Sequence, residues 1–167
     1  FNMLSNLIFK SVPLLFVLFF LFFEFSKNYF FEKQLIKPYM FFIVIYCWLN
    51  NDYRKFSPFS IFIYCTLYDL LKGEVVGITC LFLLMIQYSI RKKYNELISN
   101  DFKEDWIKFI LSFTAYLSIS SLSNVIFFDY QIDLKTMAIS YIFSIALFPL
   151  FFSMIEKLSF KFRSFNE

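Results

Sequence analysis

Few side chains in this sequence could carry out chemistry. The 167-residue chain has no histidine, which excludes a Ser-His-Asp triad, a Cys-His nucleophile pair and the two-histidine zinc motif of metalloproteases. Its three cysteines, Cys47, Cys65 and Cys80, stand far apart inside apolar runs, whereas a metal site needs clustered ligands. We therefore expect these cysteines to be small buried hydrophobic side chains. No catalytic residue, metal or cofactor is predicted, and the protein is expected not to be an enzyme.

Polar side chains inside apolar stretches are the next place to look for function. One acidic residue, Asp69, lies in such a stretch, near its end. A proton or ion pathway needs several acids at membrane depth, and an enzyme needs an acid, base or nucleophile pair facing one cavity. Neither arrangement is visible. Gln87, Asn124 and small residues such as Ser140 and Ser144 are predicted to serve helix packing.

The composition is typical of a membrane protein. Hydrophobic residues make up 59% of the chain, charged residues 17%, and there are 28 Phe but only 2 Gly. Soluble domains carry about 25% charged residues. A small soluble fold also leaves a large share of its surface exposed, so it could not bury this much apolar surface. The same hydrophobicity excludes a disordered chain.

Charged residues divide the chain into six apolar stretches. A helix rises about 1.5 Å per residue, so about 20 residues cross the hydrocarbon layer of about 30 Å. Barrel strands would alternate apolar and polar residues, and these stretches do not. We predict an all-α integral membrane protein with one transmembrane domain of six helices, or five in the alternative count. The predicted helices are 4–23, 35–50, 56–71, 75–90, 106–128 and 136–155, and a basic cytoplasmic tail covers 156–167.

The distribution of Lys and Arg predicts the orientation of these helices. With the N-terminus in the cytoplasm, 11 of the 16 basic residues face the cytoplasm, so both termini are predicted to be cytoplasmic. Anionic lipid accounts for this excess, and no nucleic-acid partner is predicted. The C-terminal tail is interpreted either as a snorkelling membrane-surface segment or as a docking site for a cytoplasmic partner. The candidate cytoplasmic basic patch consists of Arg91, Lys92, Lys93, Lys157, Lys161 and Arg163.

The short segment from Asp69 to Gly77 combines charge with both glycines of the chain. Lys72 lies three residues after Asp69, on the same helix face, and is expected to pair with it. Gly73 is predicted to end the third helix in the left-handed conformation. Gly77 is expected to let a neighbouring backbone approach closely. The segment is either a purely structural hairpin or a contact site for a partner. Pro149 is expected to kink the last helix.

Several motifs resemble those of one known family. Asp69-Leu70-Leu71-Lys72-Gly73-Glu74-Val75-Val76-Gly77 resembles the Asp-Leu-Leu-x-Gly-x-Pro-Leu-Gly pattern of the rod shape-determining MreD family, although two valines replace its Pro and Leu. Lys37-Pro38-Tyr39 is similar to that family's Arg-Pro-Asp, and Arg91-Lys92-Lys93 to its basic turn. Phe148-Pro149-Leu150 and Glu156-Lys157-Leu158 resemble its ending. The resemblance extends over about residues 35–165.

This resemblance implies a multi-pass protein of the bacterial inner membrane. It implies a non-enzymatic scaffold of the cell-elongation machinery that maintains rod shape and directs peptidoglycan synthesis. The implied partners are MreC directly, and MreB and the peptidoglycan-synthesis enzymes through the complex, with the turn from Asp69 to Gly77 as candidate contact. The implied fold is like that of the six-helix substrate-binding subunit of vitamin importers.

The alternative function is a small-solute or vitamin-binding membrane component of a transporter. Such subunits usually show Ala-x-x-x-Ala faces, on which their coupling partner docks. This chain has only Ala115, Ala138 and Ala146, and no two of them are four residues apart. The scaffold is therefore the favoured prediction.

Overall fold

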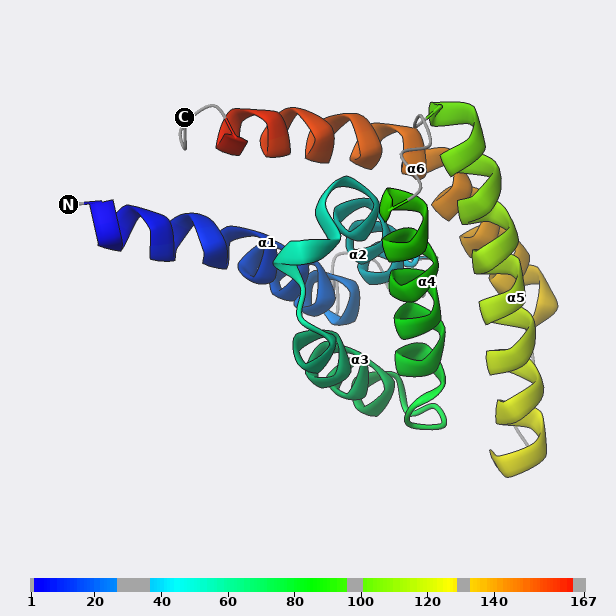
Figure 1. The fold of residues 1–167 in the computed structure, drawn as a ribbon. Helices are drawn as coiled ribbons and strands as arrows, with labels where there is room; N and C mark the ends of the chain where they lie inside the picture. The colour runs from blue at the N-terminus through cyan, green and yellow to red at the C-terminus, as the bar shows by residue number, and fades with distance from the viewer. Residues whose placement is uncertain (1, 27–36, 96–100, 129–132, 164–167) are drawn as a thin grey trace.

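The structure, a computed structural model, describes residues 2–26, 37–95, 101–128 and 133–163. Within these ranges the chain forms helices and no strand, so the all-α prediction is confirmed (Figure 1). The elements are α1 (Asn2–Phe25), α2 (Met40–Asp52), the 3-10 turn η1 (Tyr53–Lys55), α3 (Pro58–Lys72), α4 (Ile78–Asn95), α5 (Phe102–Phe128) and α6 (Leu134–Arg163).

Most helix boundaries differ from those predicted by a few residues, and the start of α2 and the end of α6 are among the larger differences. Helix α2 begins at Met40 rather than at residue 35, because Pro38 disfavours helical backbone at the residue before it. Helix α6 continues to Arg163, so the first part of the predicted tail is helical. Pro149 lies inside α6, which is helical on both sides of it, and the kink stays a prediction.

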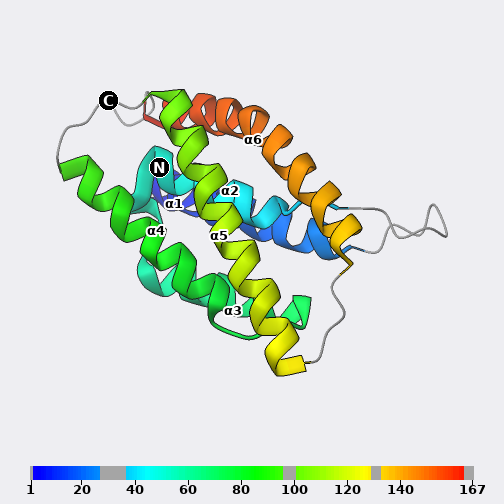
Figure 2. The same cartoon turned by 90° about the vertical axis from the view of Figure 1, so that its right-hand side faces the viewer.

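Helix α2 occupies the centre of the bundle. All ten residues from Phe41 to Asn50 are buried, as expected of a helix that is apolar on every side. Two views at right angles show α2 with α1, α4 and α6 around it, and it packs most closely against α6 and α1 (Figure 2). Helix α2 is therefore the element against which α1, α4 and α6 all pack.

Aromatic rings fill the space around α2, which accounts for many of the phenylalanines. Phe109 of α5 stacks on Phe148 of α6, with ring centroids 4.2 Å apart. Phe41 of α2 stacks on Tyr68 of α3 at 4.5 Å. Such pairs contribute about 0.5–1.5 kcal/mol beyond the burial of their area. The three free cysteines, at positions 47, 65 and 80, are buried in this core.

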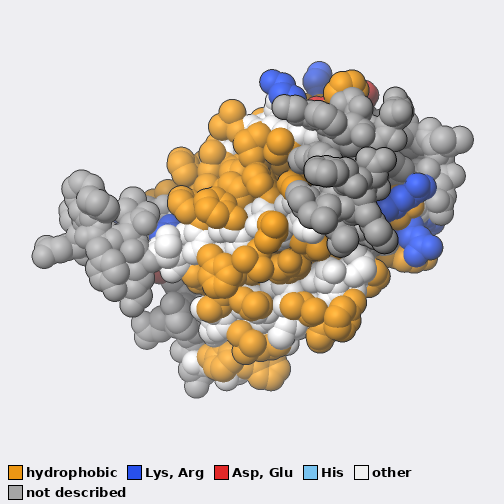
Figure 3. All heavy atoms as spheres, turned by 90° about the vertical axis from the view of Figure 1, so that its left-hand side faces the viewer, with side chains coloured by type: hydrophobic (Ala, Val, Ile, Leu, Met, Phe, Trp, Pro, Cys, Tyr) orange, Lys and Arg blue, Asp and Glu red, His pale blue; other side chains and the backbone are white. Residues whose placement is uncertain are grey.

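The outer surface of the bundle is strongly apolar. Orange hydrophobic side chains cover much of the described surface in Figure 3. Leu111, Leu122 and Phe127 of α5 are each more than 60% exposed. Large exposed apolar patches mark surfaces that meet lipid or another protein. Two helical segments, Phe102–Phe128 and Leu134–Phe160, are long and apolar enough to cross a membrane.

Two glycines shape the turn between α3 and α4. Gly73 adopts the left-handed conformation, with φ of 71°, and its N–H donates to the carbonyl of Leu70 at the end of α3. Gly77 lies just before α4 with φ of 103°. The close approach expected at Gly77 is wrong, because a Cβ there would meet nothing within 4 Å. Glycine is instead favoured at this position by its backbone conformation.

The conformation of Gly73 generates the first prediction. Replacing it by Val places a β-branched side chain at positive φ, and left-handed backbone costs L-residues about 1–2 kcal/mol. We expect Gly73→Val to lower the melting temperature of the purified protein and its level in the membrane. Asn tolerates this conformation, so Gly73→Asn is the matched control and should stay near wild type. Equal stability of the Val and Asn variants would contradict the prediction.

Candidate functional site

Charged and polar side chains gather at one end of the bundle, which we call the turn end because it holds the turn 73–77. Their hydrogen bonds connect α1, α2, α3, α5 and α6. Sequence patterns singled out Asp69 and Lys72 here but gave no role to Glu24 or Glu74, which lie at a helix end and in a loop. The bonded residues at this end are Glu24, Lys37, Tyr39, Tyr68, Asp69, Lys72, Glu74, Gly77, Ser120 and Ser144.

The carboxylate of Glu24 joins three helices. Its Oε2 accepts a hydrogen bond from the backbone N–H of Phe41 at 2.9 Å, in the first turn of α2. Its Oε1 accepts from the Tyr68 hydroxyl of α3, also at 2.9 Å. A carboxylate suits this position, because the first N–H groups of a helix lack intrahelical partners and carry partial positive charge.

Lys37 secures the other side of this junction. Its ammonium donates to the backbone carbonyl of Glu24 at 3.1 Å and to that of Ser26. A cation is favourable there, because the last carbonyls of α1 carry partial negative charge. The end of α1 and the start of α2 thus bind each other through opposite charges.

Helix α6 also contacts the start of α2. The backbone N–H of Tyr39 donates to the Ser144 hydroxyl oxygen at 2.9 Å, and that hydroxyl donates to the Ser140 carbonyl at 2.7 Å. Both serines are buried. Ser144 therefore does more than allow close packing, since it also provides an acceptor for a backbone N–H outside the helix.

Lys72 was expected to pair with Asp69, but it forms its ion pair with Glu74 instead. Their nitrogen and oxygen atoms are 2.8 Å apart, and both side chains are 18% exposed. The ammonium also lies 4.7 Å from the ring centroid of Tyr39, with Tyr68 and Tyr116 at 5.5 and 5.7 Å. This pair is thus enclosed by aromatic rings from three parts of the chain.

Asp69 accepts two hydrogen bonds from the turn that follows α3. Its Oδ2 accepts from the Gly77 N–H at 2.8 Å, and its backbone carbonyl accepts from the Glu74 N–H at 3.2 Å. The residue is only 1% exposed. The bond from Gly77 thus provides a partner that a buried carboxylate requires.

A cavity of about 300 Å³ opens beside this cluster, and Lys72, Glu74, Ser120 and Asp133 contribute to its lining. The Ser120 hydroxyl donates to Glu74 at 2.8 Å. Hydrogen bonds from the side chain and backbone of Thr136 hold the pKa of Asp133 below its ordinary value, so this carboxylate stays charged at neutral pH. Within the described ranges, no three Cys, Asp or Glu side chains are grouped to hold a metal ion.

The predicted basic patch lies away from the turn end. Arg91 and Lys92 are exposed on the C-terminal part of α4, and Lys157 is exposed on the C-terminal part of α6. Lys161 and Arg163 continue α6, and Lys93 continues α4; the side chains of these three lie outside the described part of the structure. The structure therefore does not join this patch to Asp69, Lys72 or the two glycines.

The enclosed Lys72–Glu74 pair generates the second prediction. In a double-mutant cycle with Lys72→Met and Glu74→Gln, we expect each single change to destabilise the protein, since it leaves one charge unpaired. The double variant should lose less than the two single losses combined, with a coupling of about 0.5–3 kcal/mol. Thermal unfolding in detergent measures the stability of the wild type, the two single variants and the double variant. Additive losses would mean that the two charges do not interact.

The same cycle at an exposed pair provides its control. Lys108 and Glu104 are 3.2 Å apart on one face of α5, and their side chains are 50% and 54% exposed. Water screens such a pair, so its coupling should be about 0.3–0.5 kcal/mol. A coupling at Lys72 and Glu74 no larger than this would show that enclosure by the tyrosines adds nothing.

Comparison with known families identifies the family of this chain. The family described as rod shape-determining protein MreD matches residues 5–158. No curated protein and no solved structure matches the chain. The match covers nearly the whole sequence, and the two long apolar helices agree with the membrane location of that family. The chain therefore belongs to the MreD family of membrane proteins, which determine rod shape.

Proposed function

We propose that this protein is a non-enzymatic scaffold of the cell-elongation machinery, which binds MreC and through it acts with MreB and the peptidoglycan-synthesis enzymes. The observation that supports it best is the bonding of the turn end. Glu24, Asp69, Lys72 and Glu74 each bind a helix end, a turn N–H or one another. Groups held in this way maintain a shape, whereas catalysis needs a reactive group that faces a substrate.

The turn is the proposed contact surface for MreC. Leu70 and Val76 are 65% and 51% exposed, although Leu70 follows buried Asp69 and Val76 precedes Gly77, whose N–H binds Asp69. Exposed apolar side chains on a bonded turn are suited to a protein interface. Asp69 is too buried to touch a partner, so we assign it as a positioning residue that holds Gly77 and thereby Val76.

We further propose that all six helices cross the bacterial inner membrane, with both termini in the cytoplasm. The turn end then faces the periplasm, and Arg91, Lys92 and Lys157 face the cytoplasm. Helices α2 and α3 have 13 and 15 residues, or about 20 and 22 Å, which is shorter than the hydrocarbon layer. Their packing inside the bundle, or a locally thinned bilayer, compensates for this length.

The orientation is tested by reporter fusions along the chain. Fusions after Lys93 and after Glu167 should be active only with a cytoplasmic reporter, and one at Asp133 only with a periplasmic reporter. Accessibility of single cysteines to a membrane-impermeant reagent, in a background without the three native cysteines, provides an independent readout. A periplasmic C-terminus would reject the six-helix arrangement.

Depletion and complementation in the native cells test the function. Depletion should turn rod-shaped cells round, and the wild-type gene should restore rods. Asp69→Asn weakens the bond to Gly77, since a neutral amide oxygen is a poorer acceptor than a carboxylate. We expect near-normal membrane levels of this variant, several-fold less co-purified MreC and incomplete recovery of rods.

Asp133→Asn is the matched control, because it removes the same charge from the neighbouring loop of the turn end. It should retain MreC and restore shape. Full MreC binding by Asp69→Asn would reject the turn as the contact surface. Normal shape after complete depletion would reject the scaffold itself, and stabilisation of the protein by a vitamin would favour the transporter alternative.

A further inference from the structure

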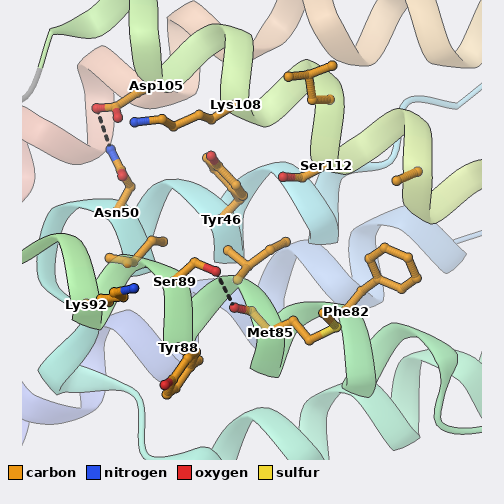
Figure 4. Close-up of a pocket in the computed structure, with 14 residues that line it drawn as sticks. Tyr46, Asn50, Phe82, Met85, Tyr88, Ser89, Lys92, Asp105, Lys108 and Ser112 are labelled. Carbon is orange, nitrogen blue, oxygen red and sulfur yellow. Dashed lines mark hydrogen bonds between the residues drawn. The ribbon is translucent and has the colours of Figure 1, made fainter.

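A large cavity lies between α2, α4 and α5, toward the end of the bundle opposite the turn. It has a volume of about 830 Å³. Figure 4 shows that its charged residues Lys92, Asp105 and Lys108 lie with Asn50 on one side, whereas Phe82 lies on the other side. The remaining lining includes Met85, Ile86, Leu111 and Ala115. The cavity is therefore amphipathic along its length.

The length of the cavity matches one leaflet of a bilayer. On α4 it extends from Phe82 to Lys92, and on α5 from Asp105 to Ala115. The two ends of each span are ten residue steps apart, or about 15 Å along a helix, which is half of the hydrocarbon layer of about 30 Å. The lysines thus lie at the depth of lipid headgroups when the apolar side lies near the middle of the membrane.

The exposed charges among the residues that line the cavity are positive. Lys92 is exposed on α4. Lys108 contacts Glu104 at 3.2 Å, but this half-exposed pair is weak and leaves the ammonium available. Asp105 is only 1% exposed, and its carboxylate accepts a hydrogen bond from the Asn50 amide at 2.8 Å. Of the charged residues that line the cavity, the two lysines are therefore exposed to an entering anion, whereas the acid is buried against Asn50.

We propose that this cavity binds one anionic phospholipid, with its phosphate at Lys92 and Lys108 and an acyl chain along Phe82, Met85 and Leu111. The lining is open to the surrounding bilayer, since Met85 and Leu111 are 61% and 65% exposed. A transmembrane helix of another protein would fill the apolar part but would leave two cations at headgroup depth unused. The lipid belongs to the cytoplasmic leaflet in the proposed orientation, although the site itself does not depend on the scaffold function.

Lipid titration of the purified full-length protein tests this proposal. Native mass spectrometry and thermal unfolding in detergent would compare phosphatidylglycerol with zwitterionic phosphatidylethanolamine. We expect phosphatidylglycerol to be retained selectively and to raise the melting temperature. In Lys92→Gln/Lys108→Gln, retention should fall about 30-fold, since each lysine strengthens the binding of an anionic lipid about fivefold.

Lys103→Gln/Lys157→Gln is the matched control. It removes the same two charges from exposed positions on α5 and α6 that do not line the cavity. This variant should retain phosphatidylglycerol as the wild type does. Equal retention of both lipids, or equal losses in the two double variants, would overturn the proposal.

The apolar half of the site is tested separately. Ala115 is exposed and lines the cavity, so Ala115→Phe should fill the acyl-chain space without strain and reduce lipid retention while both lysines remain. The circular dichroism spectrum of this variant should match the wild type. A photo-crosslinking residue at Ser112 should label lipid in membranes, and labelling of a polypeptide would assign the cavity to a partner helix and overturn the proposal.

Discussion

The fold depends on how the buried beginning of α2 satisfies its backbone N–H groups. A helix start leaves these donors without intrahelical partners, and an apolar surrounding offers no water to accept from them. Here the N–H of Phe41 binds the Glu24 carboxylate of α1, and the N–H of Tyr39 binds the Ser144 hydroxyl of α6. Helix α2 is apolar on every side, so apolar packing alone does not select a position for its neighbours. These directional bonds therefore determine where α1 and α6 pack around it.

The same constraint explains why the charges of this end are concentrated in one place. Glu24 also accepts from Tyr68 of α3, and the Tyr68 ring lies 5.5 Å from the Lys72 ammonium. Lys72 then binds Glu74 in the turn, and Glu74 accepts from Ser120 of α5. The residue that caps α2 therefore belongs to one network of contacts with residues of α3, the turn and α5. This network holds these elements in position relative to one another.

The sequence predicts the helices far better than it predicts this network. Apolar runs bounded by charges gave the six helices, and Gly73 ends α3 because only local backbone conformation is involved. The partners of Glu24 and Ser144, by contrast, lie 44 and 105 residues away along the chain. No spacing rule connects such residues. Helix spacing therefore predicted a pair between Lys72 and Asp69, whereas in the structure the Lys72 ammonium contacts the Glu74 carboxylate.

Stability alone does not account for the Lys72–Glu74 pair. Well-packed apolar residues often stabilise a protein as much as a buried ion pair of similar volume, since both charges must be desolvated. An ion pair differs in being directional. The Glu74 carboxylate accepts a hydrogen bond from Ser120 of α5. The Lys72 ammonium lies near tyrosine rings from α3, α5 and the start of α2. These contacts fix the turn relative to three elements at once, which apolar packing alone would not do.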